Sequence, residues 1–239
     1  MLRKSEEIFR NFLVWIYILI TVPLYGILAI LTRQHFWAKA WCKGLLKVLG
    51  IKIKVFKDTE LPYGIYVFMS NHQSQLDIPV LEKVLEPYNI RFLAKKSLFQ
   101  IPFFGWGIKA LGYVPVERED PKEGLKSVLA CVERLKKGFS LVIFPEGTRS
   151  PTGELLPFKI GGFLIPLRSK VKVVPVAISG TREILPKGAL WFRISKTKEV
   201  KVYLGKPIET KNFNIRDRQK LAQVVREAIL KGLEKLSKQ

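Results

Sequence analysis

Near the start of the chain, residues 11–32 form a run of 22 residues without a charged side chain, bounded by Arg10 and Arg33. A helix of that length, rising about 1.5 Å per residue, reaches across the ~30 Å hydrocarbon core of a bilayer. A cleaved signal peptide is the alternative, but the run is long and no small-x-small cleavage site follows it. Pro23 and Gly26 interrupt the run, so a kinked or tangentially inserted helix competes with a straight span.

The next segment, residues 36–49, separates two kinds of side chain when it is drawn as a helix. One face carries Lys39, Lys43 and Lys47, and the opposite face carries Trp37, Trp41, Leu45 and Val48. Opposed lysine and tryptophan faces are typical of a helix in the membrane interface, although the tryptophan face could instead pack on a protein core. Because the apolar run lies beside it, we expect residues 1–50 to form a two-helix membrane anchor, with a single span as the alternative.

The composition is basic and apolar at the same time. The chain has 41 Lys and Arg against 20 Asp and Glu, a formal charge of +21, and 48% apolar residues. That much apolar surface excludes a disordered basic tail, and two cysteines exclude a disulfide scaffold. The charge predicts an anionic partner, which could be a nucleic acid, a membrane surface or a phosphorylated substrate. Seven basic and no acidic residues between 33 and 57 place the rest of the chain on the cytoplasmic side if the first helix spans.

From residue 51 onward, short apolar runs alternate with helical patterns. Seven runs predict strands, at residues 51–56, 65–69, 90–93, 113–116, 141–144, 171–178 and 200–204. The clearest helix covers 121–137, with Asp120 as N-cap and Pro121 at its first position, and a last helix covers about 215–237. We therefore expect an α/β domain over residues 51–239, with a mixed, largely parallel sheet of about seven strands flanked by helices.

Two polar segments each follow directly on a predicted strand. Residues 71–77 read Asn-His-Gln-Ser-Gln-Leu-Asp, and residues 144–150 read Phe-Pro-Glu-Gly-Thr-Arg-Ser. Ligands of α/β sheets bind in the crevice at the carboxyl ends of the strands. If the two strands are parallel neighbours, both segments line one crevice.

The first segment has the residues of a general base. Asp77 follows His72 at a distance that allows its carboxylate to accept the Nδ1 proton, which leaves Nε2 as the base. The alternative is a histidine that only caps or packs. Ser74 lacks the strand–elbow–helix context of a nucleophile, and we expect it to cap a helix. A base without a nucleophile suggests that the activated group is a hydroxyl of the substrate.

The second segment has the features of an anion site. Gly147 permits an unusual turn, and Arg149 can hold a phosphate through two parallel hydrogen bonds. Glu146 is expected to orient Arg149 or a substrate hydroxyl, and Lys95 and Arg118 are further cationic candidates. We predict no metal ion and no cofactor at this site.

Together, the two segments resemble the glycerolipid acyltransferases, and within that family the bacterial 1-acyl-sn-glycerol-3-phosphate acyltransferases. Two more blocks fit this resemblance: residues 94–105, with Arg118 at the position of a following arginine, and residues 174–177. Ser97 stands where many relatives carry an acid. The resemblance covers roughly residues 50–210.

The resemblance implies a reaction, in which His72, held by Asp77, takes the proton from the sn-2 hydroxyl of lysophosphatidate. The hydroxyl attacks the thioester of acyl-CoA or acyl carrier protein directly, without an acyl-enzyme, and phosphatidate forms. Lys95 and Arg149 would hold the phosphate, with Glu146, Gly147 and Arg118 shaping its site. The implied location is the bacterial inner membrane, with the catalytic domain on its cytoplasmic face.

Other functions remain open at this stage. Within the family, the acceptor could be glycerol 3-phosphate or another lysolipid. Outside it, a thioester hydrolase could use the same His–Asp pair, and an anionic-lipid binder would need no catalysis at all. We expect no nucleic-acid partner, because the chain contains no recognisable nucleic-acid-binding motif.

Overall fold

The computed structural model describes residues 4–117, 121–193 and 199–239. In these ranges seven strands form one sheet: β1 (Lys52–Lys57), β2 (Val67–Ser70), β3 (Ile90–Lys95), β4 (Val114–Val116), β5 (Ser140–Ile143), β6 (Val173–Ser179) and β7 (Glu199–Leu204). Their order is β1-β7-β6-β2-β5-β3-β4, and every neighbouring pair is parallel except β6 and β7. Each predicted strand is present, and the prediction of a mixed, largely parallel sheet is confirmed.

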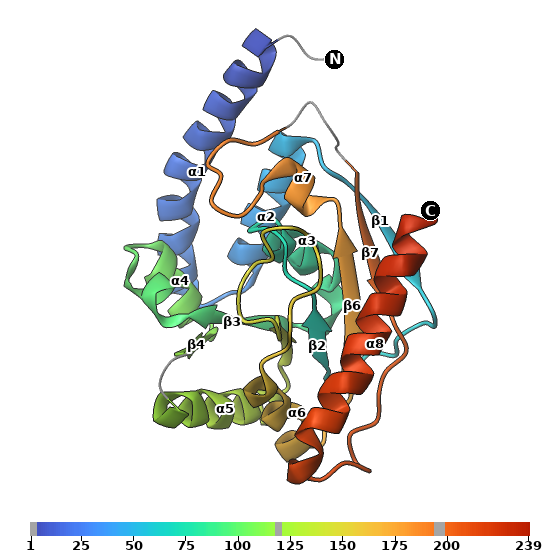
Figure 1. Ribbon diagram of the computed structural model, residues 1–239. Coiled ribbons are helices and arrows are strands. Elements are labelled where there is room, and N and C mark those ends of the chain that lie inside the picture. The colour runs from blue at the N-terminus through green and yellow to red at the C-terminus, as the bar shows by residue number, and fades with distance from the viewer. Residues whose placement is uncertain (1–3, 118–120, 194–198) are drawn as a thin grey trace.

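Helices cover both faces of this sheet (Figure 1). The α-helices are α1 (Lys4–Thr32), α2 (Phe36–Leu49), α3 (Asp77–Val84), α4 (Phe104–Ala110), α5 (Pro121–Lys136), α6 (Leu164–Ser169), α7 (Thr181–Ile184) and α8 (Arg218–Ser237). Short 3-10 helices are η1 (Glu86–Tyr88), η2 (Lys96–Gln100), η3 (Ile160–Phe163) and η4 (Ile215–Asp217). The predicted helices at 121–137 and 215–237 correspond to α5 and to η4 with α8, whereas the predicted N-cap Asp120 lies outside the described residues.

The alternation of side chains along the strands builds two cores. In β2, Phe68 packs in the cluster that includes α2 and α3, while Val67 and Met69 pack in the cluster that includes α5, α6 and α8. Successive side chains of a strand point to opposite faces, so a strand that is apolar at every position is buried on both sides. The domain is therefore a three-layer α/β/α sandwich.

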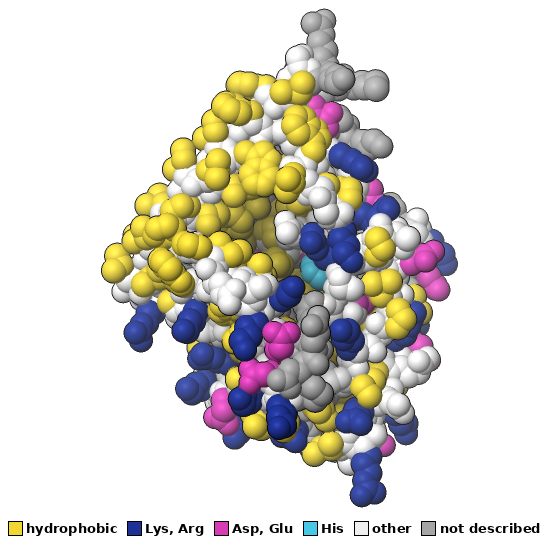
Figure 2. Space-filling model, turned by 60° about the vertical axis from the view of Figure 1, so that its left-hand side comes forward, with side chains coloured by type: hydrophobic (Ala, Val, Ile, Leu, Met, Phe, Trp, Pro, Cys, Tyr) yellow, Lys and Arg dark blue, Asp and Glu magenta, His cyan; other side chains and the backbone are white. Residues whose placement is uncertain are grey.

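Helix α1 leaves most of its apolar surface outside the protein. Only a few of its residues, such as Val14 and Ala29, are buried, whereas Leu19 and Leu31 are 69% and 74% exposed. In the described part of the chain, α1 is the one helix long and apolar enough to cross a membrane. Figure 2 shows apolar side chains gathered over one side of the molecule, with Lys and Arg next to them. Exposed apolar surface of this extent indicates association with a membrane.

Helix α2 turns its tryptophans toward α1. The Trp37 Nε1 donates to Thr32 Oγ1 at 2.8 Å and the Trp41 Nε1 to Thr21 Oγ1 at 3.0 Å, and both rings are half-buried. This arrangement matches the alternative in which the tryptophan face packs on protein. Membrane contact by Trp37 and Trp41 stays a prediction.

The lysine face of α2 is turned outward. Lys43 forms an ion pair of 2.7 Å with Glu86, Lys39 donates to the Glu86 carbonyl at 3.0 Å, and Lys47 is exposed. Leu45 and its apolar neighbours on α2 share a core cluster with the sheet. The division of the chain at residue 50 therefore also stays a prediction, because α2 packs as part of the α/β sandwich.

Candidate active site

The two polar segments meet at the carboxyl ends of β2 and β5, because these strands are parallel neighbours. The Ser150 N–H donates to the His72 carbonyl at 2.7 Å, and the His72 N–H donates to Glu146 Oε1 at 2.7 Å. Asn71 joins β6 to the same edge, because its side chain exchanges two hydrogen bonds with the Ile178 backbone. One crevice thus contains segments that lie more than 70 residues apart in the sequence.

The side chains of His72 and Asp77 form the expected pair, with 2.8 Å between Nδ1 and Asp77 Oδ2. A carboxylate at Nδ1 makes that nitrogen the donor, so Nε2 is left as the proton acceptor. The His72 ring stacks on Phe144, with 3.9 Å between centroids and 15° between planes. The ring is therefore held from two directions, while 13% of the His72 side chain stays exposed.

Asp77 is itself held by other groups. Its Oδ2 also accepts from the backbone N–H groups of Gln73 at 2.7 Å and Ser74 at 2.9 Å, and its Oδ1 accepts from Thr181 Oγ1 at 2.5 Å. The carboxylate is fully buried, so these bonds fix its position beside the imidazole. Thr181 was missed by the sequence reasoning, although it follows β6 as the two polar segments follow β2 and β5.

Ser74 does not cap α3 as expected, because the N-cap position is Leu76 and no side chain forms a capping hydrogen bond there. Its hydroxyl donates to the Leu185 carbonyl at 2.7 Å and accepts from the Leu76 N–H at 3.1 Å, just before α3 begins at Asp77. These bonds direct the Ser74 oxygen into the protein, away from the imidazole.

Glu146 lies behind the crevice, where it joins backbone segments. Oε1 accepts from the His72 N–H at 2.7 Å, and Oε2 accepts from the Leu156 N–H at 2.9 Å. Burial raises the pKa of Glu146 to about 7, although both hydrogen bonds oppose that shift. The expected contact of Glu146 with Arg149 is not among these bonds, and its contact with a substrate hydroxyl stays a prediction.

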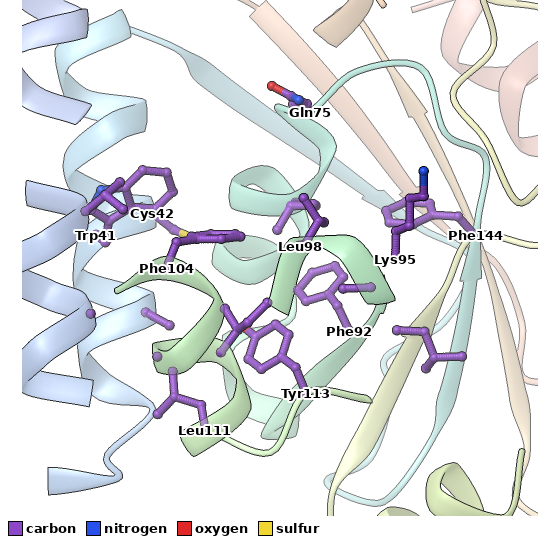
Figure 3. A pocket seen from close by; sticks show the side chains of 18 of the residues that line it. Trp41, Cys42, Gln75, Phe92, Lys95, Leu98, Phe104, Leu111, Tyr113 and Phe144 are labelled. Carbon is purple, nitrogen blue, oxygen red and sulfur yellow. The ribbon is translucent and has the colours of Figure 1, made fainter. Parts of the chain in front are cut away.

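A cavity of about 580 Å³ extends from His72 to the space between α1, α2 and α4. Figure 3 shows Phe92, Leu98, Phe104 and Tyr113 pointing into it, with Lys95 and Phe144 at the end away from Trp41. The walls are thus apolar along most of the cavity, and the polar groups lie at the His72 end.

Three of the predicted phosphate ligands line this cavity together with His72: Lys95, Gly147 and Arg149. Gly147 has φ +71°, a conformation that favours glycine, so its place in the turn is explained. Arg118 lies outside the described residues. A cationic mouth on an apolar cavity suits a ligand with an anionic head and a hydrocarbon chain.

Lys159 was missed by the sequence reasoning, and it also lines the cavity. A Cβ on Gly147 would lie 2.9 Å from Lys159 Cδ, so the lysine stem passes directly over this glycine. Its backbone N–H donates to the Pro145 carbonyl at 2.8 Å, which holds this loop against the second polar segment. No local pattern could have indicated Lys159, because the residue reaches the site from a loop.

Potential metal ligands do not gather in the part of the chain that the structure describes. No group of three or more His, Cys, Asp and Glu residues lies close enough there to hold a metal ion.

Comparisons with known proteins show which family the chain resembles. The family model described as Acyltransferase matches residues 52–179. A chloroplastic 1-acyl-sn-glycerol-3-phosphate acyltransferase of Brassica napus is 38% identical over 73% of this chain and 50% of its own length. The Saccharomyces cerevisiae 1-acyl-sn-glycerol-3-phosphate acyltransferase is 33% identical over 89% of this chain and 73% of its own length.

The fold also matches a solved structure over its full length. The crystal structure of a 1-acyl-sn-glycerophosphate acyltransferase from Thermotoga maritima superposes with a TM-score of 0.79 at 26% identity, covering 100% of this chain and 99% of that chain. The chain spans about half the length of the Brassica napus relative.

Proposed function

The chain belongs to the acyltransferase family, and on that premise we propose that it is a 1-acyl-sn-glycerol-3-phosphate acyltransferase. It transfers a fatty acyl group from an acyl thioester to the sn-2 hydroxyl of lysophosphatidate, and the products are phosphatidate and a free thiol. The donor is acyl-CoA or acyl carrier protein. The enzyme thereby serves phospholipid biosynthesis.

His72 is the general base of this reaction. Its Nε2 removes the proton of the acceptor hydroxyl while the hydroxyl oxygen attacks the thioester carbonyl carbon. The C–S bond then breaks, the new C–O ester bond remains, and His72 returns the proton to the leaving thiolate. Asp77 stabilises the imidazolium that forms, through its hydrogen bond of 2.8 Å to Nδ1. A positioned base of this kind contributes about 10²–10⁴-fold in rate.

One observation carries the choice of substrate: His72 and the cations Lys95 and Arg149 line the same end of an apolar cavity. The phosphate of lysophosphatidate binds at the cations, and the cavity accepts a hydrocarbon chain. The exposed apolar surface of α1 nearby favours a lipid acceptor over soluble glycerol 3-phosphate.

The same surface determines where the enzyme works. The apolar side of α1 lies in the membrane, and the lysines of α2 face anionic headgroups. We infer that the catalytic domain lies on the cytoplasmic face of a bacterial inner membrane, where acyl thioesters are available.

The test is acyl transfer in detergent micelles from a labelled acyl thioester to lysophosphatidate, for the wild type and His72→Ala. The matched control is His35→Gln, since His35 is the other histidine and lies in a buried contact of 3.1 Å with Tyr113. Thermal melts establish that each variant folds. We expect phosphatidate from the wild type and from His35→Gln, and a loss of about 10²–10⁴-fold in a folded His72→Ala.

Other outcomes would contradict the proposal in specific ways. Equal turnover by His72→Ala would rule out the His–Asp mechanism. Thioester breakdown that does not depend on lysophosphatidate would identify a hydrolase. Transfer to glycerol 3-phosphate or another lysolipid, but not to lysophosphatidate, would replace the acceptor.

A further inference from the structure

A second cavity, of about 620 Å³, lies between α5, η3 and α6. Its walls include Val128, Ile143 and Ile165, which belong to the core cluster on the opposite face of the sheet from α2 and α3. Five residues line both cavities: Leu93, Glu117, Phe144, Gly147 and Lys159. The two cavities therefore meet at the carboxyl ends of β3 and β5, at the ring of Phe144 on which His72 stacks.

Three glycines keep this second cavity open: Gly124 in α5, and Gly161 and Gly162 in η3. None of them has a positive φ, so their backbone conformation does not call for glycine. A Cβ on Gly161 would meet nothing within 4 Å, and one on Gly124 would meet only the Glu117 carbonyl oxygen, at 3.9 Å. Glycine inside a helix such as α5 makes the helix less stable than alanine would. Gly124 therefore lowers the stability of the fold, and no close packing contact requires it.

The position of this cavity indicates that its ligand comes from water. The first cavity runs beneath α1, whose outer surface is exposed and apolar, whereas the second lies beneath α5. The exposed residues of α5 include Lys122, Lys126 and Lys136, of which Lys126 pairs with Glu123 and Lys136 with Glu133, and also Leu125 and Leu129. Basic residues outnumber acidic ones on α5, and the excess positive charge attracts an anionic, water-soluble ligand.

Acyl transfer needs one such ligand, because its donor is soluble and its acceptor is a lipid. Both acyl-CoA and acyl carrier protein present the acyl group on a pantetheine arm, a slender chain with two amides, a pair of methyl groups and a phosphate at its far end. The methyl and methylene groups suit the apolar walls. Because glycine has no Cβ, the amides of the arm can approach the backbone of these glycines closely.

We propose that the second cavity binds the pantetheine arm of the acyl donor. The thioester carbon then lies where the two cavities meet, within reach of an acceptor hydroxyl activated by His72. The phosphate end of the arm points toward the lysines of α5. This inference rests on the proposed function, because it supposes a thioester donor.

The test fills the cavity with Gly124→Leu and, separately, Gly161→Val. Ala130→Leu is the matched control, because it adds the same side chain to an exposed position of the same helix. We measure KM for palmitoyl-CoA, for the palmitoyl thioester of N-acetylcysteamine, which lacks most of the arm, and for lysophosphatidate. We expect KM for palmitoyl-CoA to rise about tenfold in both cavity variants, with the other two constants within about twofold of wild type.

Stability separates this role from simple packing. Leucine is a better helix former than glycine, so Gly124→Leu is expected to melt at or above the wild-type temperature while its donor KM rises. Unchanged KM for palmitoyl-CoA in folded variants would overturn the inference. A rise in KM for lysophosphatidate, or an equal rise for the short thioester, would overturn it as well.

Failure of the proposed function can be recognised separately. Calorimetric titration with coenzyme A alone needs no turnover, and we expect binding to the wild type and Ala130→Leu, weakened about tenfold in Gly124→Leu. If coenzyme A binds with this pattern but no acyl group is transferred to lysophosphatidate, the second cavity remains the donor site and lysophosphatidate is ruled out as the acceptor. Absence of coenzyme A binding to the wild type would overturn the cavity assignment.

Discussion

At the scale of single residues, the catalytic pair is part of a larger hydrogen-bonded group. Asp77 accepts hydrogen bonds from the His72 ring, from two backbone N–H groups and from the Thr181 hydroxyl. Glu146 accepts a hydrogen bond from the His72 backbone N–H. The ring of His72 is thus fixed by the Asp77 carboxylate, and its main chain by the Glu146 carboxylate. A base that is held in this way is already positioned before the substrate arrives.

The Thr181 hydroxyl can be removed with little change of shape. Thr181→Val leaves Asp77 Oδ1 buried without its donor, which costs about 1–3 kcal/mol of stability. We expect kcat to fall about tenfold with KM for lysophosphatidate unchanged, because the change acts on the position of Asp77. Thr181→Ser keeps the donor and is expected to restore kcat. A variant Thr181→Val with full kcat would show that Thr181 is only structural.

Glu146 predicts a dependence of stability on pH. Its pKa is raised from 4.5 to about 7 in the folded state, because burial disfavours the carboxylate. Between these two values the folded chain retains a proton that the unfolded chain has lost, so this group lowers stability as pH rises from 4.5 to about 7. The part of this change that comes from Glu146 is expected to be a fall of about 1–3 kcal/mol in urea unfolding, read as the difference between the wild type and Glu146→Gln.

Glu146→Gln is the control for this titration. Glutamine does not titrate, so the part of the loss of stability with pH that comes from Glu146 is expected to vanish. One backbone N–H, of His72 or Leu156, then faces an amide NH₂ instead of an oxygen, so the variant also starts less stable by about 1–3 kcal/mol. The same slope with pH in both proteins would assign the titration to other groups.

At the scale of elements, α1 and α4 approach each other through glycine. A Cβ on Gly26 of α1 would lie 2.6 Å from the Phe103 carbonyl oxygen, and one on Gly107 of α4 would lie 3.2 Å from the Gly26 Cα. Phe103 has φ +60° and ψ −54°, and the Phe104 N–H donates to the Pro102 carbonyl at 2.6 Å across it. This turn is strained for a side chain such as phenylalanine, and the packing of α1 against it holds it in place.

Gly26→Ala is therefore expected to separate the two helices. Backbone atoms cannot move aside as the end of a side chain does, so the cost is about 1–3 kcal/mol and the melting temperature falls. Ile27→Ala, at the next and exposed position of α1, serves as the control with little change in melting temperature. Equal melting temperatures for Gly26→Ala and the wild type would show that the α1–α4 contact is loose.

The outer face of α1 gives a second prediction at this scale. Leu19→Lys with Leu24→Lys places two charges on exposed positions, so the fold is retained, but each charge is costly in hydrocarbon, by about 2.5–3.5 kcal/mol at its centre. We expect flotation with lipid vesicles to be lost. Leu230→Lys on α8, away from α1 in Figure 1, is the control with normal flotation. Flotation of the double variant would place the membrane contact on another surface.

At the scale of the whole molecule, the net charge of +21 adds a long-range attraction to anionic surfaces. Binding to vesicles that contain anionic lipid is expected to weaken as salt rises from about 0.01 M to 1 M, because the screening length falls from about 30 Å to 3 Å. Binding to neutral vesicles is expected to depend on salt much less, because it rests on apolar burial. Equal salt dependence for the two vesicles would mean that the net charge has no part in membrane binding.

Several features of the protein could be predicted from sequence because they are local. Strands at 65–69 and 141–144 are recognised from short apolar runs, and the polar segments that follow them stand at strand ends whatever the rest of the chain does. The spacing from His72 to Asp77 is also local, since one turn and the start of α3 bring the two together. The long uncharged run is likewise a property of consecutive residues, so α1 was predicted as a helix.

What only the tertiary structure decided depends on contacts between distant residues. The strand order places β2 between β5 and β6, and so brings Thr181 to Asp77 and Glu146 to the His72 backbone. In the structure the tryptophans of α2 face α1. Helical periodicity could not predict this, because an amphipathic helix shows the same pattern whether its apolar face packs on protein or on lipid. Lys159 and the second cavity depend on how a loop packs against α5 and the sheet. Local patterns determine which segments form and what they carry, while packing free energy, summed over partners far apart in the chain, determines which of them meet.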